Sequence, residues 1–123
     1  MVRAIPTSPA TPPLDPQILA DLRRLNSPDN PSFFDRLVAR FFRSSQTQID
    51  EIRHGVARHD PEALRFAVHA LKGSARQLGA HTLSALCERA LHEIEDDDTR
   101  CVHAAAAFIE AEHARVCRAL LTE

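Results

Sequence analysis

The sequence predicts an all-α protein, and three observations support this prediction. Glycine is rare, with 3 in 123 residues, and aromatic residues make up only 5% of the chain. Alanine and leucine outnumber the β-branched and aromatic residues that favour strands. Apolar residues recur at intervals of three and four in five successive segments, four of them long. We therefore expect an up-down antiparallel four-helix bundle with a short extra N-terminal helix.

Start and stop signals define the first three helices. Asp15-Pro16 and Asp60-Pro61 each place an N-cap residue before a proline at the first helical position. Asn30-Pro31 is interpreted in the same way, as the start of the second helix. The predicted helices begin at these three pairs and end near residues 25, 58 and 78, with Gly79 as the C-cap of the third.

Two further helices complete the predicted bundle. The fourth covers residues 81–94, and the fifth follows an acidic turn at 95–98. That turn puts negative charge at the start of the fifth helix, where the helix dipole favours it. Short connections between the later helices predict that sequence neighbours run antiparallel.

The chain length supports one domain. A chain of 123 residues can enclose one bundle core but not two. Residues 1–13 are rich in proline and offer little to bury, so we interpret them as a linker or a disordered arm. Residues 14–123 then form the domain, which we expect to be a monomer.

Charge and cysteine content exclude several classes of protein. The formal net charge of −2 gives no general attraction to nucleic acid or to anionic membranes. No apolar run approaches the roughly 20 residues that a membrane span requires, so we expect no membrane insertion. The 3 cysteines lack Cys-x-x-Cys spacing and are expected to be reduced thiols in a cytoplasmic protein.

The third predicted helix carries an unusual polar face. One side of the helix is apolar and the opposite side gathers Arg65, Phe66, His69, Lys72, Gly73 and Arg76. His69 lies at the centre of this face among cations. Gly73, one turn further on, leaves the imidazole uncovered although glycine inside a helix costs about 1 kcal/mol relative to alanine. This pattern favours an imidazole that a large partner must reach.

These residues resemble the motif of histidine-containing phosphotransfer (HPt) domains in multistep phosphorelays. The short form of that motif, His-x-Leu-Lys-Gly-Ser, is matched from His69 to Ser74, and Leu78-Gly79-Ala80 follows at the end of the helix. Apolar positions of the fourth helix continue the resemblance at Leu83, Leu86, Cys87 and Leu91. Helical periodicity extends it from about Leu14 to the C-terminus.

The resemblance implies that the chain carries phosphoryl groups between receiver-domain aspartates. His69 would be the nucleophile and would form a phosphoramidate at Nε2. Lys72 lies one turn along on the same face and would pair with the phosphoryl oxygens. Such a domain is either free-standing or attached to a hybrid sensor kinase, in which case residues 1–13 would be its tether. The sequence offers no metal site, so we expect Mg²⁺ to be held by the receiver and no cofactor by this chain.

The same resemblance gives docking roles to the residues around His69. Arg65 and Arg76 would steer the acidic pocket of a receiver toward the imidazole. Gly73 would let the receiver's loops approach the ring. Phe66 either contacts the partner or folds over onto the second helix. We expect Ser74 to be structural, with its hydroxyl bonded to the carbonyl one turn back or to the neighbouring helix, and Gly79 to be structural as well.

Two positions depart from patterns known in related proteins. Some HPt domains orient the imidazole with a glutamine from the next helix, and this chain has Leu91 there. Histidine-kinase helices usually place an acid directly after the reactive histidine, where this chain has Ala70. Because a nucleotide-binding segment is also missing, we expect no autonomous kinase or phosphatase activity.

Three other interpretations are weaker. The 7 histidines suggest a metal site, but Glu88 with His92, and His113 with Cys117, offer only two ligands each. The segment 75–84 resembles the turn of a helix-turn-helix DNA reader, yet its second helix is mainly acidic, which opposes binding to phosphates. A helical interaction module that is not phosphorylated remains the principal alternative.

Overall fold

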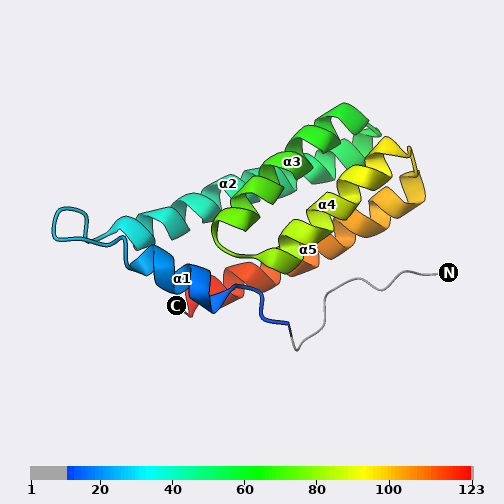
Figure 1. Ribbon diagram of the computed structural model, residues 1–123. Coiled ribbons are helices and arrows are strands. Elements are labelled where there is room, and N and C mark those ends of the chain that lie inside the picture. The colour runs from blue at the N-terminus through cyan, green and yellow to red at the C-terminus, as the bar shows by residue number, and fades with distance from the viewer. Residues whose placement is uncertain (1–10, 123) are drawn as a thin grey trace.

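The computed structural model describes residues 11–122, which form five helices (Figure 1). In chain order these are α1 (Pro16–Arg23), α2 (Phe33–Arg58), α3 (Pro61–Gln77), α4 (His81–Glu95) and α5 (Thr99–Leu121). The described residues contain no β-strand, and the prediction of an all-α protein is confirmed. Most of the proline-rich segment 1–13 lies outside the described residues.

The four long helices form the predicted bundle. Each is antiparallel to its neighbour in the chain, and contacts join α2 to α3, α3 to α4, α4 to α5 and α5 back to α2 (Figure 1). The backbones of the diagonal pairs stay further apart, and the side chains of all four helices meet in one central core. The core is made of fully buried aliphatic side chains, which include Ile49, Ile52, Leu71, Leu83 and Ile109. Burial of each such side chain contributes about 1.5–3 kcal/mol.

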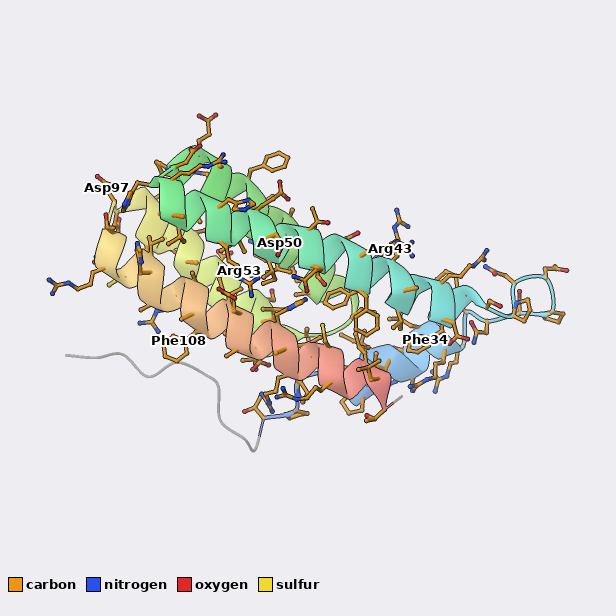
Figure 2. The ribbon with its side chains drawn as sticks, turned by 180° about the vertical axis from the view of Figure 1, so that it is seen from behind. Phe34, Arg43, Asp50, Arg53, Asp97 and Phe108 are labelled. Carbon is orange, nitrogen blue, oxygen red and sulfur yellow. The ribbon has the colours of Figure 1, made fainter. Side chains whose placement is uncertain are left out.

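A bridge of charged side chains ties α2 to α5 on the outside of this core. Arg53 points from α2 toward α5, where its guanidinium lies 2.6 Å from the carboxylate of Glu110 (Figure 2). Asp50 lies one turn before Arg53, with its carboxylate 3.5 Å from the same guanidinium. Arg53 and Asp50 are more than half exposed, so the bridge contributes little to stability.

The short helix α1 closes one end of the bundle. Leu14 and Leu19 insert their side chains into the core. The backbone N–H of Asp15 donates to the carbonyl of Gly79 at 2.9 Å, and the Asp15 carboxylate lies 2.9 Å from Nε2 of His81. The pKa of Asp15 is lowered, chiefly by this contact with His81. The helix is therefore held at the α3–α4 turn as well as at the start of α2.

The predicted start of α2 at Asn30-Pro31 is wrong. The helix begins at Phe33, and Ser32 occupies the N-cap position without a capping side-chain bond. The cap comes instead from Asn26, whose Oδ1 accepts the backbone N–H of Phe34 at 2.9 Å. Asn30 is occupied elsewhere, because its backbone exchanges two hydrogen bonds with Ser27 and closes a tight turn.

Gly79 ends α3 in a left-handed conformation, with φ of 74°. Its N–H donates to the carbonyl of Arg76 at 3.2 Å, and the N–H of Ala80 donates to Ala75 at 2.9 Å. These two bonds form a Schellman motif, which satisfies the last carbonyls of the helix. A Cβ at position 79 would lie 2.9 Å from Cβ of Asp15, so the close approach of α1 also requires glycine.

Candidate functional site on the outer face of α3

The orientation of α3 exposes the polar face predicted from the sequence. Asp60 caps the helix by accepting the N–H of Ala63 at 3.1 Å, and Pro61 follows at the first helical position. The inner face buries five apolar side chains, Leu64, Ala67, Val68, Leu71 and Ala75. Burial of this face leaves the opposite side of α3 in solvent.

His69 lies exposed on this outer face. Among residues 11–122 its ring has neither a hydrogen bond nor an ion pair. Both ring nitrogens are therefore open to an incoming group. An imidazole nitrogen with an accessible lone pair can act as a nucleophile near neutral pH.

Gly73 leaves an open space one turn after His69. A Cβ added at this glycine would meet nothing within 4 Å outside the helix's own backbone. The internal packing of the protein therefore does not require glycine here, although glycine in a helix costs about 1 kcal/mol relative to alanine. The cleared surface is available to a partner that approaches His69.

Lys72 lies beside His69 and is held by the neighbouring helix α4. Its Nζ lies 2.5 Å from Oε2 of Glu88, and its side chain is only 19% exposed. The hydrogen bond from Lys72 is the main cause that lowers the pKa of Glu88. Glu88 was not among the residues predicted for this face. Its position directly after the buried Cys87 was the available signal, because it places Glu88 at the border between α4 and α3.

The other predicted docking residues share the exposed face with His69. Arg65, Phe66 and Arg76 are all exposed, and the Phe66 side chain is exposed by 75%. That exposure decides between the two alternatives for Phe66, because a ring folded onto α2 would be largely buried. The structure therefore brings all six residues of the predicted polar face together on one surface, with Lys72 alone half-buried.

A family model of the Hpt domain matches residues 36–120 of this chain. The chain belongs to the Hpt domain family. The match covers most of the bundle, from the first turn of α2 to the end of α5, and includes the whole of α3. Comparison with curated proteins gives no match. Hpt domains carry a phosphoryl group on a histidine in phosphorelays and interact with receiver domains, so this chain is a phosphotransfer histidine carrier.

The structure of this Hpt domain also shows the surroundings of Ser74 and Leu91. The Ser74 hydroxyl lies 3.3 Å from the carbonyl oxygen of Ala70 and 3.4 Å from Oε1 of Gln48 on α2. It therefore contacts both of the partners considered from the sequence. Leu91 lines the groove between α3 and α4 together with His69 and is half-buried, so its apolar side chain leaves the imidazole without an orienting bond.

The described part of this Hpt domain contains no group of three or more potential metal ligands. His92 lies 3.7 Å from Glu88, and Nε2 of His113 lies 3.5 Å from Sγ of Cys117, but each pair lacks a third ligand. Over residues 11–122, none of the helices has the length and apolar character needed to cross a membrane.

Proposed function

We propose that this Hpt domain accepts a phosphoryl group on His69 from the aspartate of a receiver domain and passes it to the aspartate of another. One observation carries the proposal: His69 is exposed, and unpartnered among residues 11–122, at the centre of the polar face of α3, with open space over Gly73. A monomer is sufficient for this role, because the whole face belongs to one helix.

In the transfer step, covalent bonds change only at the imidazole and at the acyl phosphate. The lone pair of Nε2 of neutral His69 attacks phosphorus as the P–O bond to the aspartyl carbonyl group breaks. The bonding electron pair leaves with the oxygen and regenerates the carboxylate. The phosphohistidine keeps its proton on Nδ1 or releases it to solvent, and the reverse step returns the phosphoryl group to an aspartate.

Positive charge around His69 would stabilise the phosphoryl group during its transfer. Lys72 is one turn away and would form charge-assisted hydrogen bonds to the phosphoryl oxygens. Arg65 and Arg76 add positive charge on the same face and would attract the acidic pocket of a receiver. We propose that the receiver supplies Mg²⁺, because phosphoryl transfer relies on a metal held beside the phosphate. The chain itself then needs no bound cofactor.

The test is transfer from an aspartyl-phosphorylated receiver in the presence of Mg²⁺. We expect an acid-labile, alkali-stable phosphate on the wild-type chain and none on His69→Gln. The matched control is His103→Gln, which changes another exposed histidine on α5, away from the groove of His69, and should leave transfer intact. A folded wild-type chain that takes no phosphate from any of several receivers would contradict the proposal and favour an interaction module without phosphorylation.

A further inference from the structure

The contact between Lys72 and Glu88 has a consequence for the phosphorylated state. It is a 2.5 Å ion pair that joins α3 to α4 beside His69. Lys72 has no other ion pair among the described residues. Its ammonium group is therefore paired with Glu88 while His69 carries no phosphate.

The ion pair between Lys72 and Glu88 lies in the same groove as His69. Lys72, Glu88 and His69 line the same groove between α3 and α4. The other carboxylate oxygen of Glu88, Oε1, lies 3.7 Å from Nε2 of His92. Oε1 of Glu88 thus faces His92 on its own helix, while Oε2 contacts Lys72 across the groove.

A phosphoryl group on His69 would compete with Glu88 for the same ammonium group. The phosphoryl oxygens carry up to two negative charges and the carboxylate carries one. Lys72 lies one turn from His69 and is the cation nearest to it in sequence within this groove. Glu88 therefore opposes phosphorylation by occupying the Lys72 ammonium group.

We infer that Glu88 is a positioning residue that acts through Lys72 and limits the stability of phosphohistidine at His69. The inference rests on the proposed function for its biological use, since a weaker hold on the phosphoryl group favours onward transfer. The side chain of Glu88 does not touch the reacting atoms. Its effect is exerted through the availability of the Lys72 ammonium group.

The inference predicts the effect of Glu88→Gln on the phosphorylation equilibrium of His69. We expect the ratio of phosphorylated to unphosphorylated His69 to rise about fivefold, a modest gain because Glu88 is partly exposed and such ion pairs are weak. In a Lys72→Ala background the same substitution should change the ratio less than about twofold, because the residue through which Glu88 acts is gone.

The experiment uses phosphoramidate as the phosphoryl donor, so that no receiver is needed. The full chain and its variants are equilibrated with phosphoramidate at fixed ammonium concentration, and phosphohistidine is measured by ³¹P NMR. The P–N bond of the donor breaks as the P–N bond to His69 forms, and ammonia is released. The spectrum of His69→Gln identifies signals from the other exposed histidines. Thermal unfolding of each variant confirms that the fold is kept.

The matched control is Glu95→Gln. Glu95 lines the same groove on the same helix but has no ion pair among the described residues. A gain confined to Glu88→Gln and lost in the Lys72→Ala background supports the inference. An unchanged ratio in Glu88→Gln, an equal gain in Glu95→Gln, or an equal gain without Lys72 would overturn it. Failure of the proposed function would appear separately, as an absence of transfer between His69 and receivers.

Discussion

Two histidines of this chain occupy opposite environments. His69 lies on the outer face of α3, exposed and without a hydrogen-bond partner among the described residues. His113 lies inside the bundle on α5 and is only 7% exposed. Its Nε2 lies 2.8 Å from the hydroxyl oxygen of Ser45 on α2. The centroid of its ring lies 6.2 Å from the centroid of the Phe41 ring. Burial is the main cause that lowers the pKa of His113.

The difference shows that access and unused bonding capacity, rather than the imidazole itself, separate a reactive histidine from a structural one. His113 uses its ring nitrogen to satisfy a buried hydroxyl, so that nitrogen cannot also attack a phosphoryl group. Among residues 11–122 His69 makes no hydrogen bond, so we expect it to contribute little to stability.

Two glycines show the same contrast. Gly55 on α2 is buried, and a Cβ there would lie 2.8 Å from Cγ of Leu64. Gly73 on α3 has nothing within 4 Å of the same position. Internal packing requires the first glycine, whereas internal packing gives no reason for the second.

Alanine at the two histidines should separate their roles most clearly. His113→Ala is expected to lower the free energy of unfolding by about 2–4 kcal/mol, because it opens a cavity and leaves Ser45 without its partner. His69→Ala should change that free energy by less than about 0.5 kcal/mol, as expected for an exposed site. Urea denaturation followed by circular dichroism measures both values. Equal losses from the two variants would contradict the assignment of separate roles.

Alanine at the two glycines should shift stability in opposite directions. Gly73→Ala is expected to stabilise α3 by up to about 1 kcal/mol, because the helix gains propensity without a clash. Gly55→Ala should destabilise the protein by about 1 kcal/mol, since overpacking against Leu64 outweighs the gain in propensity. Thermal unfolding of the two variants provides the comparison. Stabilisation by both substitutions would mean that Leu64 moves aside without cost.

A long side chain introduced at position 73 tests the docking role of the open surface. Gly73→Gln should keep the fold but weaken binding to a receiver about tenfold, which corresponds to 1.4 kcal/mol, because the side chain covers His69. Isothermal titration with the receiver that phosphorylates the chain measures the affinity. The matched control is Ala63→Gln, at an exposed position earlier on α3. Wild-type affinity in Gly73→Gln would remove docking as the reason for this glycine.

The smallest expected effect is the pH dependence that His113 gives to stability. Because its folded-state pKa lies below the ordinary value of 6.5, the unfolded chain binds more protons as the pH falls through that value. The contribution is therefore complete above pH 6.5 and is lost as the pH falls toward the folded-state pKa. Urea denaturation on both sides of this value should show a small loss of stability at the lower pH in the wild type. His113→Gln should show a smaller loss.

The sequence predicted most of the fold because its strongest signals are local. Helical periodicity, the Asp-Pro caps of α1 and α3 and the glycine at the end of α3 act within a few residues. The one wrong helix start, at Asn30-Pro31, arose where a local signal competed with a more distant one. Asn26 lies eight residues before the N–H that it caps, and sequence windows of one turn do not include such a pair.

The same distinction between local and distant contacts applies to the candidate site. The composition of the exposed face of α3 follows from the spacing of residues on one helix, so the sequence alone determined that His69, Gly73 and Arg76 share a surface. Only the tertiary structure decided that Lys72 is held by Glu88, 16 residues later, and that His113 meets Ser45, 68 residues away. Such contacts depend on the rotation and crossing of whole helices, which the packing of the entire core fixes and no single segment encodes.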